Sequence, residues 1–230
     1  MTLLKPTLGI AIFGAVALSI TLANKASSKY EEPQFKVIEK LGKNIEIREY
    51  KPRIAAEVTV DKEWDDALNS GFRILAGYIF GKNRSNQKVA MTAPVTAQED
   101  SEDLNGKSLK IAMTTPVTAA RTEEPDASGG WKIRFYMPSK FSLDTLPEPE
   151  DKRIKLKELP AETFAVIRFS GWSNQDSFTK HLEELKKKLL DSSKFKESGQ
   201  PTNAFYNPPW TLPFFRRNEI LIPVEQSSES

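Results

Sequence analysis

The sequence of 230 residues contains no cysteine and a single histidine, His181. The absence of cysteine excludes disulfide bonds, thiol nucleophiles and cysteine zinc sites. A Ser-His-Asp triad would have to use His181, and a metal site with two histidine ligands cannot form. The catalytic and metal chemistries open to the chain are therefore few.

The chain also lacks an excess of charge of one sign. It has 33 basic and 31 acidic side chains, which gives a formal net charge of +2. A broad nucleic-acid-binding face normally needs clustered basic charge. The only basic triplet, Lys186–Lys188, is typical of the solvated face of a helix. We therefore expect no nucleic-acid partner.

One long apolar run stands at the N-terminus, where Thr7–Ala23 contains 17 residues without a charge. This is somewhat long for the core of a signal peptide and short for a spanning helix, which needs about 20 residues. We interpret residues 1–23 as a signal peptide or an uncleaved membrane anchor, with possible membrane contact, and residues 24–34 as a polar linker. The body is then expected outside the cytoplasm, in the periplasm if the source is bacterial, or in an organelle.

Two segments of the body have the apolar periodicity of amphipathic helices. The first runs from Asp61, a good N-cap, to about Phe80, and Gly81 closes it. The second follows Ser173, which we expect to cap it. Its apolar stripe consists of Phe178, Leu182, Leu185 and Leu189.

Alternating apolar and polar residues predict strands in the rest of the body. Ile45–Tyr50 and Arg53–Val60 are interpreted as partner strands. Two segments, Lys88–Ala97 and Lys110–Ala119, match at eight of ten positions, and each contains a proline that suggests an edge strand or a bulge. Further strands are predicted at Trp131–Pro138, Ile154–Leu159, Thr163–Gly171, Asn203–Pro209 and Asn218–Val224.

The order of these elements is strand-strand-helix-strand-strand, twice, which indicates an internal duplication. Two helices over a mostly antiparallel sheet that curls toward a barrel belong to the α+β class. We expect one domain over residues 35–225, followed by a loose polar tail at residues 226–230.

Several motifs follow one another in a recognisable order. The strongest is Trp64–Asn83 leading into Lys88–Thr96, and four shorter ones are Ile45–Tyr50 (IEIREY), Phe135–Pro138 (FYMP), Tyr206–Pro209 (YNPP) and Arg216–Ile220 (RRNEI). With them, residues 36–224 resemble the SOUL heme-binding protein family. The resemblance implies a distorted antiparallel β-barrel with two flanking helices, built from a duplicated half, that binds heme or free porphyrin in a hydrophobic groove.

A tetrapyrrole site needs an apolar groove and a cation near the propionates, and heme iron can also take an axial ligand. For the groove we predict Phe72, Leu75, Ala76 and Ile79 on the first helix, with Trp210 and Phe214 on an aromatic loop. In one branch of the family two basic residues lie on the first helix, and the matching positions here are Asn69 and Gly77. Arg73 lies midway between them on the same face and is predicted to supply the cation. Lys82 and Arg84 are further candidates.

The axial ligand implied by the resemblance is missing. Another branch proposes a histidine at the position that Glu49 occupies in this chain. His181, Tyr78, Met91 and Met113 are more typical of surface or packing positions than of iron ligands. We therefore expect hydrophobic binding without strong axial ligation, in a monomeric carrier or buffer rather than an enzyme.

Two alternatives remain open. The aromatic loop could contact lipid or a partner at an envelope surface. A small-molecule hydrolase could use paired carboxylates, Glu49 with Glu57 or Glu219. The sequence contains no Gly-x-Ser-x-Gly elbow, HExxH motif or Walker loop to support a particular enzyme class.

Overall fold

The computed structural model describes residues 30–84, 108–122, 130–208 and 210–227. The expected signal peptide or anchor, residues 24–29 of the expected linker, and the first proline-containing repeat with Met91 lie outside the described residues, as do residues 228–230. Within the described ranges, no helix is long and apolar enough to cross a membrane.

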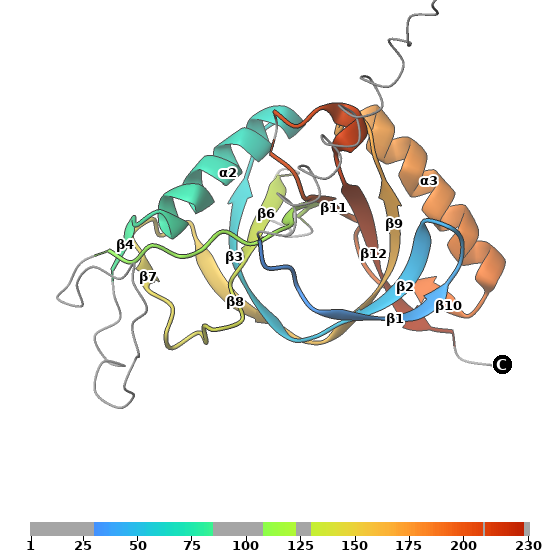
Figure 1. Ribbon diagram of the computed structural model, residues 1–230, viewed down its shortest axis with the longest axis horizontal. Helices are drawn as coiled ribbons and strands as arrows, with labels where there is room; N and C mark the ends of the chain where they lie inside the picture. The colour runs from blue at the N-terminus through green and yellow to red at the C-terminus, as the bar shows by residue number, and fades with distance from the viewer. Residues whose placement is uncertain (1–29, 85–107, 123–129, 209, 228–230) are drawn as a thin grey trace, which may run out of the picture.

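The described residues form one large sheet, a small two-stranded sheet, two α-helices and a short 3-10 helix (Figure 1). The strands are β1 (Phe35–Lys40), β2 (Ile45–Tyr50), β3 (Arg53–Val60), β4 (Asn83–Arg84), β5 (Val117–Arg121), β6 (Trp131–Tyr136), β7 (Glu148–Pro149), β8 (Lys155–Leu159), β9 (Glu162–Phe169), β10 (Phe195–Glu197), β11 (Thr202–Phe205) and β12 (Asn218–Gln226). The helices are α2 (Trp64–Ile79), α3 (Gln175–Ser192) and the 3-10 helix η2 (Pro213–Phe215).

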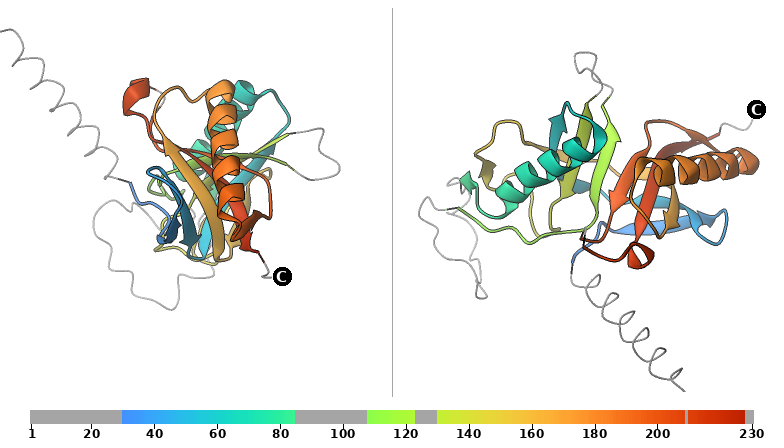
Figure 2. Two further views of the ribbon diagram at one scale, coloured as in Figure 1. Left: turned by 90° about the vertical axis from the view of Figure 1, so that its right-hand side faces the viewer. Right: turned by 90° about the horizontal axis from the view of Figure 1, so that it is seen from above.

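The large sheet is antiparallel and has the strand order β1-β2-β9-β12-β11-β5-β6-β3-β8, with β10 paired to β12. It curls strongly, and α2 and α3 lie outside the curve (Figures 1 and 2). Helix α2 packs on β3 and β6, and α3 packs on β9, β10 and β12. The predicted α+β class, a distorted antiparallel barrel with two flanking helices, is confirmed.

The two halves of the duplication exchange strands. Strands β3 and β9 have the same length and the same succession of buried and exposed positions, and each precedes a helix. The predicted pairing of β2 with β3 is wrong, because β2 pairs with β1 and β9, whereas β3 pairs with β6 and β8. Only Lys51 and Pro52 join β2 to β3. Tight two-residue hairpin loops need positive φ angles, which proline cannot adopt, so the chain crosses to the other side of the curl instead.

The second proline-containing repeat forms a strand only after its proline. Residues 110–113 are not in a strand, and β5 begins at Val117, directly after Pro116. The strand pairs with β11 and β6, so it lies inside the sheet, and of the two predicted alternatives the edge position is wrong. Proline has no N–H to donate, and its place just before the strand leaves the ladder intact.

Both helices begin later than predicted. The N-cap of α2 is Glu63 rather than Asp61. The N-cap of α3 is Asn174, whose side chain accepts a hydrogen bond from the Ser177 N–H at 3.0 Å. Ser173 does not cap the helix, because its hydroxyl hydrogen-bonds the Asn218 side chain instead. At the other end of α2, Gly81 adopts a φ of 115°, as expected for a closing glycine.

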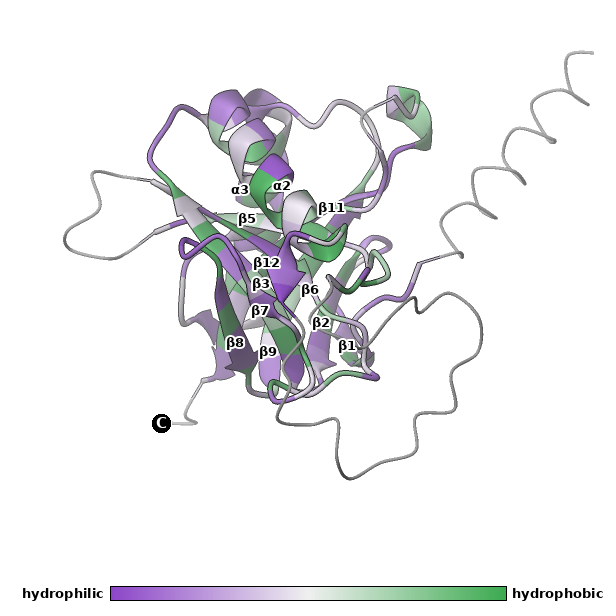
Figure 3. Cartoon of the chain, turned by 90° about the vertical axis from the view of Figure 1, so that its left-hand side faces the viewer, coloured by the Kyte–Doolittle hydropathy of each residue, from purple (hydrophilic) through white to green (hydrophobic). Residues whose placement is uncertain are grey.

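The two faces of the sheet bury different chemistry. The convex face packs apolar side chains such as Val58, Ile133 and Ile167 beneath the helices. The concave face carries a second apolar cluster around Phe164 and Leu221, with buried charged residues beside it. Hydrophobic and hydrophilic positions accordingly alternate along the strands in Figure 3. The buried charged side chains Arg48, Glu57 and Glu219 therefore lie on the concave face.

Candidate functional site

The five residues predicted on α2 divide between the core and the surface. Leu75, Ala76 and Ile79 are buried in the core between the helix and the sheet. Phe72 is 41% exposed, and its ring packs against that of Phe135 with the centroids 5.3 Å apart. Arg73 is exposed. A planar ligand on α2 could therefore contact Phe72 and Arg73 directly, with the three buried residues supporting that surface from below.

The predicted aromatic loop presents its side chains to solvent. Trp210 is 83% exposed and Phe214 is 64% exposed, and Leu212 is exposed between them. Trp172, which sequence analysis did not select, adds a further exposed ring, at 65%. We call these four residues the apolar loop patch. Large exposed apolar side chains this close together usually mark an interaction site.

The apolar loop patch is anchored on the connection between β9 and α3 and not on α2. The carbonyl of Pro213 accepts a hydrogen bond from the Gly171 N–H at 2.9 Å. The Arg216 guanidinium lies 5.9 Å from the centroid of the Trp172 ring. Figure 1 shows η2 over the ends of the helices, but both views in Figure 2 show it standing away from them. The two predicted groups thus belong to separate parts of the surface, and their role in ligand binding stays a prediction.

Two side chains considered as iron ligands are engaged elsewhere. The Tyr78 hydroxyl is buried and donates a hydrogen bond to the carbonyl of Pro147 at 2.9 Å. Burial also raises the pKa of Tyr78 above its usual range, so its phenolate is disfavoured. The His181 ring stacks on Phe169, with the centroids 4.0 Å apart, and its Nδ1 lies 3.3 Å from the Glu184 carboxylate.

Other ligand positions offer no better arrangement. Glu49 lies exposed on β2, opposite Lys36 and Thr163 on the neighbouring strands. Met113 is half-buried against the main core. In the described part of the chain, no cluster of three or more histidine or acidic residues could hold a metal ion.

Gly77 stands where one branch of the family has a basic residue, and the nearby Lys82 could supply that charge. A β-carbon built at Gly77 would lie 3.2 Å from Cδ of Lys82, so the aliphatic stem of this lysine covers the position. Arg73 lies one turn earlier on α2. Both cations are exposed, Arg73 on α2 and Lys82 just beyond its end.

The concave face holds a buried ion-pair network that sequence analysis did not predict. Glu219 is fully buried, and its Oε2 lies 3.0 Å from Nη1 of Arg48 and accepts a 2.7 Å hydrogen bond from the Tyr206 hydroxyl. Its Oε1 lies 3.0 Å from Nη2 of Arg217. We call Arg48, Tyr206, Arg217 and Glu219 the Glu219 cluster. The Arg217 guanidinium also binds both oxygens of Glu32 at 3.0 Å. The last residues of the expected linker are thus held against the body.

Glu57, the third carboxylate considered for acid–base catalysis, is neutralised separately. It is almost fully buried on β3, and its Oε2 accepts a hydrogen bond from Nε of Arg134 at 3.0 Å. Its Oε1 lies 2.5 Å from Nζ of Lys157. Burial alone would raise the pKa of Glu57, but the hydrogen bonds from Lys157 and Arg134 outweigh it, and the pKa is lowered. A lowered pKa does not suit a general acid at neutral pH.

One sequence signal could have revealed these networks. Glu57 and Glu219 each stand within an apolar strand, and a buried charge requires a partner. Arg217, two residues from Glu219, is a partner that this spacing could have suggested, but Arg48 lies 171 residues away and could not be read from the sequence.

Comparisons with known proteins agree with this fold. The family model of the SOUL heme-binding protein matches residues 30–223. Heme-binding protein 2 of Homo sapiens is 29% identical over 199 residues, which cover 85% of this chain and 86% of that protein. Heme-binding protein 2 of Mus musculus is 30% identical over 181 residues, covering 76% of this chain and 75% of that protein.

Two solved structures share the fold at low identity. The C-terminal domain of EcmrR has a TM-score of 0.53 at 12% identity, and the match covers 80% of this chain and 98% of that domain. A hydrolase from Listeria innocua has a TM-score of 0.51 at 12% identity, covering 87% of this chain and 98% of the other. Because the family model spans most of the sequence, the chain belongs to the SOUL heme-binding protein family.

Proposed function

We propose that this protein binds heme or a related tetrapyrrole on a hydrophobic surface and acts as a carrier or buffer. The observation that carries the proposal is the match of the SOUL heme-binding protein model over residues 30–223. The relatives named heme-binding protein 2 in two mammals support the same ligand class.

The exposed residues suit such a ligand in two respects. A tetrapyrrole offers a flat apolar ring and carboxylates at one edge. Phe72 and Phe80 are exposed on α2 and at its C-terminal end, and the exposed cations Arg73 and Lys82 neighbour them in the sequence. The ring would lie on the phenylalanines and the carboxylates would meet the cations.

The same surface offers iron little ligation. Tyr78 is buried and hydrogen-bonded. His181 is on the other helix, α3, where its ring stacks on Phe169 of β9. Without a strong axial ligand, the protein would hold the tetrapyrrole mainly through apolar contact. This favours transport or storage over redox catalysis, because axial ligands are the main means of setting an iron potential.

Spectroscopic titration of the full chain with hemin and with metal-free protoporphyrin tests the proposal. We expect saturable binding of both, with affinities that agree within about threefold, because apolar contact does not depend on iron. Phe72→Ala should weaken both. Leu190→Ala, which removes an 80% exposed side chain from α3, is the matched control and should change neither.

Absence of saturable binding of either compound would overturn the proposal. A preference for hemin of more than about tenfold, which corresponds to about 1.4 kcal/mol, would show that iron is ligated and would overturn the mode of binding.

Contact with a lipid surface is a second candidate, favoured by the apolar loop patch. Exposed tryptophan and phenylalanine next to arginine, here Arg216, are typical of protein surfaces that contact membranes. Co-sedimentation of the full chain with anionic vesicles should fall when Trp210 is replaced by alanine, while Leu190→Ala leaves it unchanged. The predicted N-terminal signal or anchor would place the body outside the cytoplasm, and cell fractionation tests that location.

A further inference from the structure

The concave face of the sheet contains a cleft whose charged lining residues are mostly basic, and the proposed heme binding does not use it. It has a volume of about 170 Å³ and is lined mainly by strands on both sides of the curl. Among the described residues that line it, the basic ones are Arg53, Arg121, Lys132 and Arg134, and the one acidic residue is Glu162. We call this the Arg53 cleft. Its composition is suited to an anion.

Arg53 is an enclosed residue of this cleft, and its hydrogen bonding is incomplete. Its side chain is 10% exposed, and its Nη2 lies 3.0 Å from Oε2 of Glu162. Its Nη1 makes only long contacts, 3.4 and 3.5 Å, with the carbonyls of Lys51 and Pro160. Its Nε is buried and has no hydrogen-bond partner among the described residues. Buried donors are nearly always satisfied, so an acceptor from a ligand or a water molecule would complete the hydrogen bonding of this Nε.

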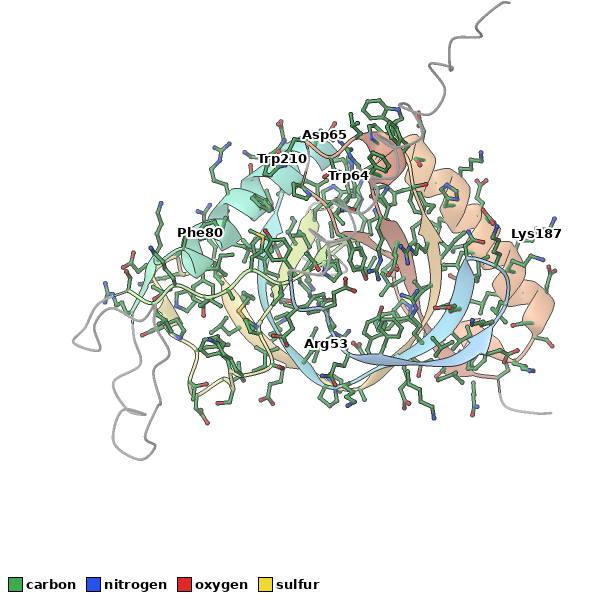
Figure 4. The ribbon with its side chains drawn as sticks, in the orientation of Figure 1. Arg53, Trp64, Asp65, Phe80, Lys187 and Trp210 are labelled. Atoms are coloured by element: carbon green, nitrogen blue, oxygen red, sulfur yellow. The ribbon has the colours of Figure 1, made fainter. Side chains whose placement is uncertain are left out.

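Aromatic rings hold the Arg53 guanidinium in place. Its Cζ lies 5.2, 5.4 and 5.7 Å from the ring centroids of Tyr50, Tyr136 and Phe164. Figure 4 shows Arg53 inside the curve of the sheet. Tyr136 and Phe164 also line the cleft, so an apolar group of a ligand would pack on them. A cation that is fixed before binding loses little conformational freedom when the ligand arrives.

The Glu162 carboxylate binds the same guanidinium that a ligand carboxylate would use. Its side chain is 38% exposed, so it can turn toward solvent and release Nη2 of Arg53. Nε and Nη2 then form one edge of the guanidinium, which fits the two oxygens of a carboxylate.

We propose that the Arg53 cleft binds a small aromatic carboxylate. The ligand carboxylate takes Nε and Nη2 of Arg53 and displaces Glu162, and the ligand ring packs on Tyr136 and Phe164. The volume limits the ligand to about one ring, because sites for drug-sized molecules have about 300 to 1,000 Å³. The cleft lies on the opposite face of the sheet from α2, so this binding is independent of the proposed heme surface.

Calorimetric titration of the full chain with benzoate tests the proposal. Benzoate should bind saturably, whereas benzylamine, which has the same ring and the opposite charge, should not. Arg53→Gln should weaken benzoate binding at least about tenfold, the usual effect of removing a charge-assisted hydrogen bond. Glu162→Gln should strengthen it about threefold, because the internal competitor loses its charge. Arg153→Gln removes an exposed arginine paired with Asp151 and serves as the control, with no change expected.

NMR gives a measurement that needs no variant, since the Nε–H resonance of Arg53 should move on addition of benzoate. The Glu162→Gln variant keeps the test decisive if Arg53→Gln does not fold. The proposal is overturned if benzoate fails to bind both the wild type and Glu162→Gln, or if benzylamine binds as well. Tighter binding of inorganic phosphate than of benzoate would also contradict it, because the cleft would then select charge without the ring.

Discussion

The Glu219 cluster and the Arg53 cleft share the concave face but differ in how completely their buried polar groups are paired. In the cluster, each arginine has two acidic partners: Arg48 binds Glu46 and Glu219, and Arg217 binds Glu32 and Glu219. In the cleft, Arg53 pairs with Glu162 and Arg134 pairs with Glu57, but the buried Nε of Arg53 has no partner among the described residues. The two regions therefore differ in one respect, which is that the cleft keeps a buried donor without a partner among the described residues.

Water reaches the centre of the cluster less than it reaches the rim of the cleft. The side chains of Arg48 and Glu219 are 6% and 0% exposed, so an unpaired charge there would lose its hydration without compensation. Arg134, at the rim of the cleft, is 25% exposed, so its charge is screened by solvent as well as by its partner Glu57. A fully paired buried network therefore supports the fold, whereas a cleft with an unsatisfied donor and a partly exposed rim can accept a ligand.

The largest expected effect comes from neutralising the centre of the cluster. Glu219→Gln leaves Arg48 and Arg217 with reduced pairing at buried positions, where they cannot be rehydrated. We expect the free energy of unfolding to fall by about 3–5 kcal/mol. Urea unfolding followed by circular dichroism measures this loss. A loss below about 1 kcal/mol would mean that the network is solvated, and the contrast with the cleft would fail.

A smaller loss is expected for the carboxylate beside the cleft. Glu57→Gln should cost about 1–3 kcal/mol, because the side chains of its partners Arg134 and Lys157 are 25% and 43% exposed and regain water. The pKa of Glu57 is lower in the folded protein than in the unfolded chain. Its ion pairs therefore stabilise the fold at neutral pH, and the contribution is lost as the pH falls below the usual glutamate value toward the folded pKa.

Urea unfolding of the wild type and Glu57→Gln at about pH 7 and about pH 4 tests this dependence. The difference in stability between the two proteins should shrink in acid. Parallel pH profiles would mean that Glu57 is not the group responsible.

A third effect concerns the tyrosines of the concave face. Burial and the charge of Glu219 raise the pKa of Tyr50 to about 12, and burial and the same charge raise the pKa of Tyr206 well above its usual value. In Glu219→Gln both should titrate at lower pH, as followed by tyrosinate absorbance. Tyr78, whose pKa is raised by burial alone, is the internal control and should not respond. An unchanged titration of Tyr50 would contradict the charge coupling.

Much of the fold could be predicted because local patterns determine it. The bounds of β2 and β3 agree with the predicted strands, since strict alternation identifies a strand that buries one face. Strand β1 was not predicted, because at the edge of the sheet its residues are nearly all exposed and show no alternation. The pairing of β2 with β9 could not be predicted, because their residues are more than 100 positions apart in the sequence.

The candidate sites were less predictable for the same reason. Apolar residues on α2 could be found from periodicity, but not that Phe72 is exposed while Leu75 is buried, because this depends on how the helix is turned toward β6. The free nitrogen of Arg53 depends on contacts with Pro160 and Glu162, more than 100 residues away. In the sequence, Arg53 is a single arginine at the start of a strand, and nothing near it indicates that one of its nitrogens is left unpaired.

The smallest effect is expected where ion pairs lie on the outer surface. Lys196 and Glu225 pair across β10 and β12 at 3.1 Å, and both side chains are 59% exposed. Glu225→Gln should change the free energy of unfolding by less than about 1 kcal/mol, and salt should reduce even that, because water screens both charges. The substitution is chemically the same as Glu219→Gln, so urea unfolding of the two variants isolates the contribution of burial. Equal losses would mean that enclosure in the curled sheet does not determine the strength of these ion pairs.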